Sequence, residues 1–191
     1  MLKIPVIFGS VRSERLGHQP ANYLLKQCQA RGFDSTLVDP VEFPLPLLDK
    51  MYKEYEPGSA PPLLQKLADI IVPADAYLIV TAEYNHSVPP ALSNLLDHFL
   101  DEYYFKPSAI ACYSVGSYGG VRAAMQLRVM LAEMGMSSIP SILPFPKVGQ
   151  AFDESGAPTS ERTDKSTGRF LDELAWYASA LKTQRASGTP Y

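Results

Sequence analysis

The sequence has few of the residues that bind metals or cross-link a chain. Two cysteines, three histidines and one tryptophan occur among 191 residues. Cys28 and Cys112 both lie inside apolar patterns, so we expect two reduced core thiols in a cytoplasmic protein rather than a disulfide framework. No histidines and cysteines are spaced as metal ligands, and we expect no metal site.

Basic charge and long apolar runs are also scarce. The 17 Lys and Arg residues face 20 Asp and Glu residues, which gives a formal net charge of −3. Such a chain lacks the positive field that attracts nucleic acid or an anionic membrane. The first apolar run, residues 4–8, is too short for a signal peptide, and no later run approaches the length of a membrane span. We therefore expect neither nucleic acid nor membrane as a partner.

What the sequence does contain is an ordinary globular composition. Hydrophobic residues make up 46% and charged residues 19% of the chain. A length of 191 residues fits one domain with a full core, and we expect a single domain over residues 1–191.

Short apolar runs alternate with helical patterns along the chain. The runs predict five strands, at residues 3–8, 35–38, 76–81, 109–113 and 138–142. Helical spacing and Gly or Pro boundaries predict five helices, at residues 19–31, 63–72, 90–100, 121–134 and 168–181. Residues 40–62 and 143–164 are expected to be long loops, the first with a helical turn, and residues 183–191 a frayed tail.

This alternation predicts a parallel α/β sheet with right-handed helical crossovers. In a sheet of strand order 2-1-3-4-5, the first, third and fourth strands are adjacent. The loops that follow these strands then meet at one edge, which is where open parallel sheets bind ligands. We therefore expect one shared site there.

The loop after the first strand, residues 9–18, has the features of a phosphate receptor. It offers a serine hydroxyl, two arginines and backbone N–H groups just before a helix, where the helix dipole favours an anion. A solvated turn with surface arginines is the simpler alternative. The loop lacks the Gly-Lys-Ser/Thr of a Walker A loop, its glycine spacing does not match a Rossmann fingerprint, and it contains no cysteine nucleophile.

The other two loops suit a flat heteroaromatic ligand. Residues 81–92 carry an aromatic ring and polar groups directly out of a buried strand, although Ser87 could simply cap the following helix. Residues 114–122 contain glycines that would let backbone approach a ligand or merely permit a tight turn.

Together these loops resemble those of the NADPH-dependent FMN reductase family, over residues 4–135. The most specific segments are residues 83–92, followed by Asn94 and Asp97, and the Gly9-Ser10-x-Arg12-x-x-Arg15 start. One departure is Ala82, where the family usually has proline. The resemblance implies a flavodoxin-like three-layer sandwich with a five-stranded parallel sheet of order 2-1-3-4-5.

The resemblance also implies residue roles. The FMN phosphate would be held by the first loop, through Ser10, Arg12 and Arg15, with His18 and Gln19 nearby. The isoalloxazine would be met largely by backbone groups of Glu83, Tyr84 and Asn85. Its other edge would be bordered by Ser117, Tyr118 and Gly119. The flavin carries the redox chemistry, so no catalytic side chain is required.

The activity implied is ping-pong hydride transfer from NADPH or NADH to flavin N5, and then to a small acceptor. Quinones, ferric chelates, chromate, azo compounds and free flavin are the acceptors of the family. Two alternatives stay open: a flavodoxin-like one-electron carrier that does not oxidise NAD(P)H, and a non-catalytic nucleotide-binding module. The modest charge argues against the carrier, because such proteins dock through strongly acidic faces.

The resemblance to the FMN reductase family also implies a homo-oligomer, either a dimer or a dimer of dimers, in which a second subunit closes the flavin pocket. We expect the helix 90–100 and the aromatic run after it to build that interface. Tyr103 and Tyr104 are the preferred interface residues, while Phe99 and Leu100 could equally pack within the subunit.

Overall fold

Five parallel strands form one sheet, in a computed structural model that describes residues 1–191. The strands are β1 (Val6–Phe8), β2 (Leu37–Val38), β3 (Tyr77–Ala82), β4 (Pro107–Tyr113) and β5 (Ser137–Phe145). Their order is β2-β1-β3-β4-β5, and every neighbouring pair is parallel. The predicted 2-1-3-4-5 topology is confirmed.

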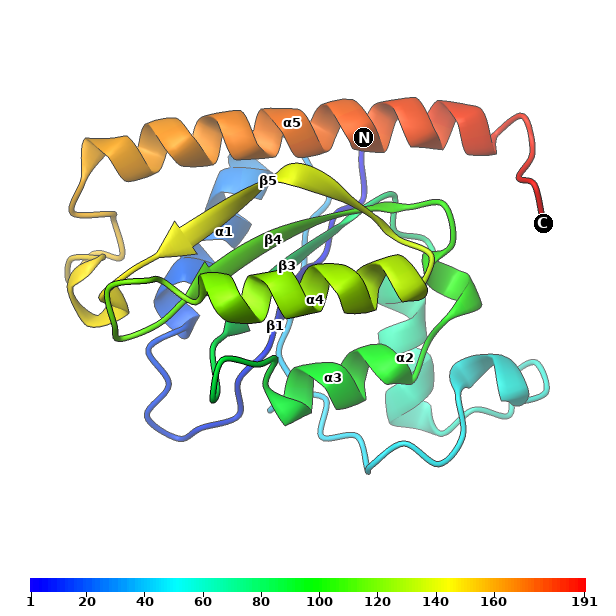
Figure 1. The fold of residues 1–191 in the computed structure, drawn as a ribbon. Helices are drawn as coiled ribbons and strands as arrows, with labels where there is room; N and C mark the ends of the chain where they lie inside the picture. Colours follow the sequence, from blue (N-terminus) through cyan, green and yellow to red (C-terminus); the bar gives the residue numbers. More distant parts are fainter.

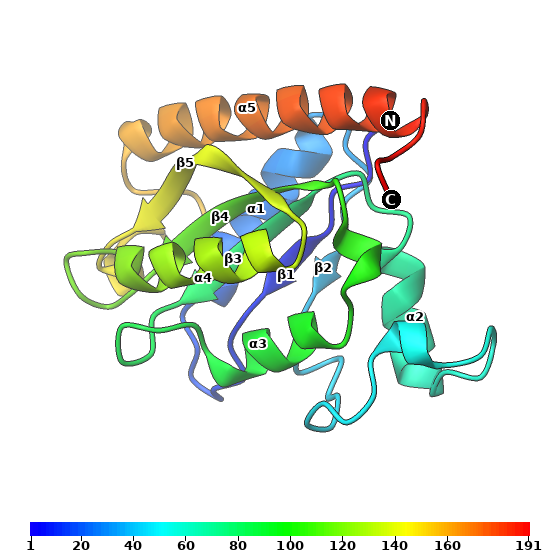
Figure 2. The same cartoon turned by 45° about the vertical axis from the view of Figure 1, so that its right-hand side comes forward.

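Helices cover both faces of the sheet and make a three-layer sandwich. They are α1 (His18–Ala30), α2 (Pro62–Ile71), α3 (Pro90–Asp97), α4 (Val121–Glu133) and α5 (Glu161–Arg185). Figures 1 and 2 show α1 and α5 on one face and α2, α3 and α4 on the other. Short 3₁₀ turns occur at Tyr52–Glu54, Asp101–Tyr103 and Val148–Gln150, and the first of these is the helical turn expected in the loop 40–62.

The two faces of the sheet carry separate hydrophobic cores because side chains alternate along each strand. Val6 and Phe8 pack with α1 and α5, while Ile7 between them packs with the other three helices. The face of α1 that the sequence predicted to be apolar is buried, including Cys28. Cys112 is also buried, and neither thiol is in a disulfide.

The C-terminal third differs most from the expected element bounds. The strand predicted at 138–142 extends over Ser137–Phe145, and the helix predicted at 168–181 extends over Glu161–Arg185, so the loop 143–164 shrinks to residues 146–160. Strand β5 tolerates Pro140 and Pro144 because it is an edge strand. The tail is not simply frayed, since the Tyr191 ring packs 4.8 Å from that of Phe105.

The aromatic segment after α3 lies largely inside the subunit, contrary to expectation. The helix predicted at 90–100 ends at Asp97. Tyr103 is completely buried, and its ring lies 5.1 Å from Tyr77 and 6.2 Å from Phe99. A side chain already buried in its own core cannot build an interface, so the prediction for Tyr103 is wrong; Tyr104 stays partly exposed. None of the helices is long and apolar enough to cross a membrane.

Candidate functional site

The loop between β1 and α1 presents a row of free backbone donors. Seven of its N–H groups find no acceptor in the protein. They belong to Ser10, Val11, Ser13, Glu14, Arg15, Leu16 and Gly17. The loop lies close against α3: a Cβ added to Gly9 would come within 2.8 Å of the Leu92 side chain. Unpaired amides that precede a helix are a receptor for an anion.

Ser10 and Arg12 lie within this loop in positions suited to a phosphate. Ser10 is buried at 2% exposure, and its hydroxyl lies 2.8 Å from the hydroxyl of Tyr84, which follows β3. The Arg12 side chain is exposed and has no ion-pair or hydrogen-bond partner within the protein, and the Arg12 N–H reaches the Ser10 hydroxyl at 3.5 Å. Its guanidinium is therefore available to an anionic ligand.

Arg15 has a different environment from Arg12. Its guanidinium forms a two-pronged ion pair with Asp39, at 2.7 Å and 2.5 Å, and also donates to the Ser10 carbonyl at 2.5 Å. Both side chains are largely buried, at 17% and 11% exposure. This geometry makes Arg15 a support of the loop backbone, which differs from the direct phosphate contact that the sequence suggested. Asp39 was not among the expected site residues, although it comes directly after β2 at the same edge of the sheet.

Two polar groups beneath the loop are buried without partners. They are the Gln19 Oε1 atom and the Tyr113 hydroxyl. The Tyr113 hydroxyl is so close to the loop that a Cβ on Gly17 would lie 2.1 Å from it. Burial raises the pKa of Tyr113, so this hydroxyl stays protonated and can donate. Orphaned buried polar groups beside free amides fit a bound phosphate ligand. His18 is exposed, and its Nδ1 lies 2.6 Å from the Arg15 carbonyl oxygen.

The loop after β3 makes a tight turn whose tip is exposed. Tyr84 and Ser87 exchange backbone hydrogen bonds of 3.0 and 2.9 Å. The two residues between them, Asn85 and His86, have φ values of 51° and 62°. Two successive left-handed residues are typical of a type I′ turn, which points their backbone groups outward. This agrees with an expected contact to a ring edge through backbone.

Two other side chains of this segment have structural roles. The Glu83 carboxylate accepts hydrogen bonds from the N–H groups of Arg122 and Ala123 in the first turn of α4, at 3.1 and 3.3 Å. The Glu83 carboxylate thus caps the N-terminal end of α4, the helix that follows the loop after β4. Ser87 donates to Gln126 at 2.7 Å and does not cap α3, whose N-cap is Pro89, so that expectation is wrong.

The loop after β4 completes the edge. Ser117 and Tyr118 are exposed, while Gly119 and Gly120 are buried with φ values of 62° and 83°. A Cβ on Gly120 would lie 2.7 Å from the Tyr113 carbonyl oxygen, so only glycine fits this turn. The Arg122 guanidinium lies 4.4 Å from the centre of the Tyr118 ring and 3.7 Å from Glu83.

Two contacts therefore join the three loops into one surface. The Ser10–Tyr84 bond links the loops after β1 and β3, and the Glu83 cap links the loops after β3 and β4. The edge combines free amides, a free arginine and exposed turn backbone, which is the chemistry needed for a phosphate attached to a flat ring. No group of three or more His, Cys, Asp or Glu side chains is placed to hold a metal ion. The fold is flavodoxin-like, and its three-loop edge carries the groups that a phosphorylated ring ligand requires.

Comparison with known proteins narrows this class. The NADPH-dependent FMN reductase family matches residues 2–150. A 2-hydroxy-1,4-benzoquinone reductase from Burkholderia sp is 33% identical over 180 residues, covering 91% of this chain and 94% of the relative. A quinone reductase from Pseudomonas putida is 29% identical over 192 residues, covering 96% of each. The solved structure of FerB, a flavoenzyme NAD(P)H:(acceptor) oxidoreductase from Paracoccus denitrificans, shares the fold with a TM-score of 0.75 and 24% identity, covering 94% of this chain and 98% of FerB.

The chain belongs to the NADPH-dependent FMN reductase family. It is an oxidoreductase of flavodoxin-like fold, with FMN as the cofactor and NAD(P)H as the co-substrate of its family.

Proposed function

We propose that this single-domain chain, residues 1–191, uses FMN at the three-loop edge to pass electrons from NADPH or NADH to small oxidised molecules, quinones foremost. The observation that carries the proposal is the 2.8 Å bond between Ser10 and Tyr84. It holds a loop with free amides against a turn with outward-facing backbone, and these are the two halves of a site for a phosphorylated ring.

We assign different parts of FMN binding to different residues of this edge. Ser10, Arg12 and the free amides hold the phosphate, with Gln19 and Tyr113 beneath and His18 at the rim. Arg15 keeps this loop in shape through Asp39. The backbone of Glu83, Tyr84 and Asn85 meets one edge of the ring, and Ser117, Tyr118 and Gly119 border the other. FMN, when bound, supplies the hydride-accepting and hydride-donating chemistry.

An open edge favours small, permissive acceptors. Asn85, Ser117 and Tyr118 are all exposed, so the protein builds no deep pocket around the reacting face from these side chains. Several quinone reductases are among its relatives, and a quinone is the acceptor that we propose first. Ferric chelates, chromate, azo compounds and free flavin belong in the same panel. One shared face for nucleotide and acceptor requires ping-pong kinetics, with parallel double-reciprocal lines across a grid of both substrates.

We also propose a cytoplasmic homo-oligomer whose second subunit covers the exposed loop tips. Burial raises the pKa of Cys28 to about 11 and that of Cys112 to about 12, so both thiols are unreactive and suit a reducing compartment. Light scattering of the FMN-loaded protein measures the mass. A monomer in solution would contradict the oligomer, and Tyr103 is no longer part of the interface proposal.

The test of the function is anaerobic mixing of FMN-loaded protein with NADPH or NADH. We expect rapid bleaching of the flavin absorbance by at least one nucleotide alone, followed by recovery when a benzoquinone is added. A carrier like flavodoxin would resist the nucleotide and accumulate a stable one-electron form during chemical titration. A protein that purifies colourless and takes up no FMN would instead be a non-catalytic binding module.

A further inference from the structure

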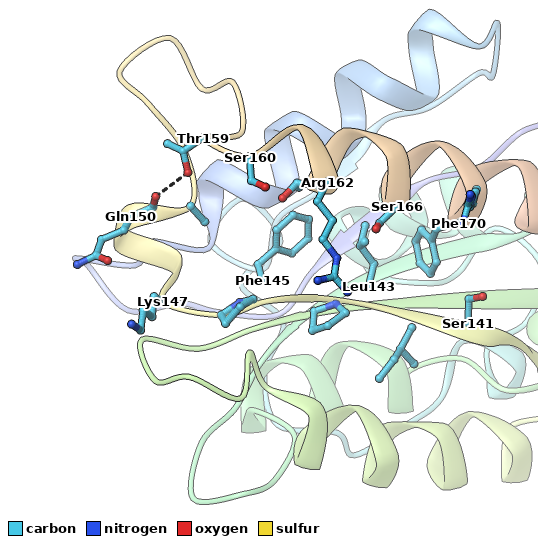
Figure 3. A pocket seen from close by; sticks show the side chains of 16 residues that line it. Ser141, Leu143, Phe145, Lys147, Gln150, Thr159, Ser160, Arg162, Ser166 and Phe170 are labelled. Atoms are coloured by element: carbon cyan, nitrogen blue, oxygen red, sulfur yellow. Dashed lines mark hydrogen bonds between the residues drawn. The ribbon is translucent and has the colours of Figure 1, made fainter.

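A second groove lies between the edge strand β5 and the first half of α5. Its volume is about 740 Å³, within the range of small-molecule sites. Figure 3 shows its two walls: strand residues such as Leu143 and Phe145 on one side, and helix residues such as Ser166 and Phe170 on the other. None of the residues proposed to bind FMN lines it.

All charged side chains that line this groove are cationic. They are Lys147, Arg162 and Arg169. None of the three forms an ion pair or a side-chain hydrogen bond within the protein. Figure 3 shows Arg162 extending from α5 across the groove toward β5. Three unpaired cations around one concavity are electrostatically complementary to an anion.

Two of the four acidic residues of α5 are engaged on another side of the helix. Asp164 accepts a 2.6 Å hydrogen bond from the Tyr23 hydroxyl on α1, and Asp172 lies 3.4 Å from Arg31 at the end of α1. Arg162, Ser166 and Arg169 are spaced i, i+4 and i+7, so they form one stripe along the groove. The helix thus turns the carboxylates of Asp164 and Asp172 toward α1, and the side chains of Arg162 and Arg169 line the groove.

The groove also has an apolar floor. Ile142, Leu143 and Phe145 of β5 and Phe170 of α5 line it. Such a surface contacts the face of a flat ring. A peptide strand is a poorer occupant, because Pro140 and Pro144 remove two N–H groups from the edge that it would pair with. The backbone positions of Arg162 and Arg169 are about 10 Å apart along the helix axis, a spacing that suits charges spread over a ligand rather than one compact ion.

We propose that this groove binds an aromatic polyanion: a flat apolar ring system that carries two or three sulfonate, phosphate or carboxylate groups. Arg162 and Arg169 bind anionic groups along the helix, Lys147 binds one at the end of the strand, and the ring lies on the apolar floor. The site is separate from the FMN edge but adjoins it, since the Lys147 N–H donates to the Gly116 carbonyl at 3.0 Å.

The experiment is calorimetric titration of FMN-saturated protein with naphthalene-1,3,6-trisulfonate. Saturation with FMN keeps the probe from the phosphate loop. We expect one saturable site with Kd below about 1 mM. Arg162→Gln and Arg169→Gln should each raise Kd at least about tenfold, the loss of one charge-assisted contact. Inorganic sulfate should bind far more weakly, because it lacks a ring. Circular dichroism checks that each variant is folded.

Two controls separate this site from general charge effects. Lys165→Gln removes the same charge from an exposed position of the same helix that does not line the groove, and should change Kd less than about twofold. Lys26→Gln, at an exposed position of α1 that does not line the groove, should also leave Kd unchanged. Absence of saturable binding, equal weakening by Lys165→Gln or Lys26→Gln, or sulfate binding as tightly as the trisulfonate would each overturn the proposal.

Discussion

The hydroxyl groups of Ser10 and Tyr84 lie 2.8 Å apart and join the loop after β1 to the loop after β3. The two residues are 74 positions apart in the sequence, so this bond fixes the relative position of two segments that FMN must contact together. Ser10 lies among the free amides of the phosphate loop, whereas Tyr84 starts the turn at the ring edge. The bond therefore organises the site before the cofactor binds.

We predict that Ser10→Ala and Tyr84→Phe each lower the unfolding free energy of the FMN-free protein by about 1 kcal/mol, the net value of one hydrogen bond. The double variant should lose little more than either single variant, because both remove the same bond. Ser10→Ala should also weaken FMN binding more than Tyr84→Phe, since only Ser10 is proposed to touch phosphate. Urea unfolding and FMN titration measure both effects. Fully additive losses of stability would show that the two hydroxyls act independently.

Arg12 is expected to contribute to FMN affinity and not to folding. Its side chain is exposed and has no partner in the protein, so Arg12→Ala should leave the unfolding free energy within about 0.5 kcal/mol of wild type. FMN affinity should fall at least about tenfold, because a charge-assisted bond to phosphate contributes roughly 1.5–3 kcal/mol. Arg12→Lys should restore part of the loss. Calorimetry that finds unchanged FMN affinity in Arg12→Ala would remove this residue from the site.

Arg15 should behave in the opposite way. Arg15→Gln leaves the carboxylate of Asp39 buried without its counter-ion, and breaking a buried pair costs about 3 kcal/mol. We therefore predict a large loss of stability in the FMN-free protein, measured by urea unfolding. Asp39→Asn should be similarly destabilising, although Asp39 is not proposed to touch FMN. If Arg15→Gln keeps wild-type stability and loses only FMN affinity, Arg15 is a direct ligand.

Much of this architecture can be read from local patterns, because strand and helix periodicities report directly on burial. The strand order, the buried face of α1 and the convergence of three loops follow from patterns within single segments, such as the helical spacing that includes Leu24 and the strand end that Gly9 marks. The pairing of Arg15 with Asp39 is different. The sequence places both at one edge of the sheet, but only the three-dimensional path of the loop decides which polar side chain each arginine meets.

Segments without an apolar pattern are also hard to predict from the sequence. Residues 161–166 form the start of α5 but are mostly exposed, so they carry no hydrophobic stripe that would predict a helix. The burial of Tyr103 inside the subunit is hard to predict for a related reason. Its ring, in a 3₁₀ turn, packs against Tyr77 of β3. The two residues are 26 positions apart, so no local spacing in the sequence reveals this contact.

Lys106 gives stability a pH dependence remote from the FMN edge. Its ammonium donates to the Val72 carbonyl at 2.7 Å and lies 3.2 Å from the Tyr77 hydroxyl. Burial, with a smaller effect from Arg185, lowers the pKa of Lys106 to about 8, despite the opposing charges of Asp75 and Glu102. In the unfolded chain the lysine pKa is about 10.4. Between these values the unfolded chain binds more protons than the folded one, so the contribution of Lys106 to stability rises with pH.

We predict that the unfolding free energy of wild type, relative to Lys106→Met, increases by about 2 kcal/mol from about pH 7 to about pH 9.5. Below about pH 8 the buried charge destabilises the fold in full, and deprotonation removes that cost. Urea unfolding of both proteins across this range measures the difference, with Lys165→Met as the matched control for an exposed lysine. The control should show no such trend. A difference between wild type and Lys106→Met that stays constant, or falls, as pH rises would mean that Lys106 keeps an ordinary pKa in the folded protein.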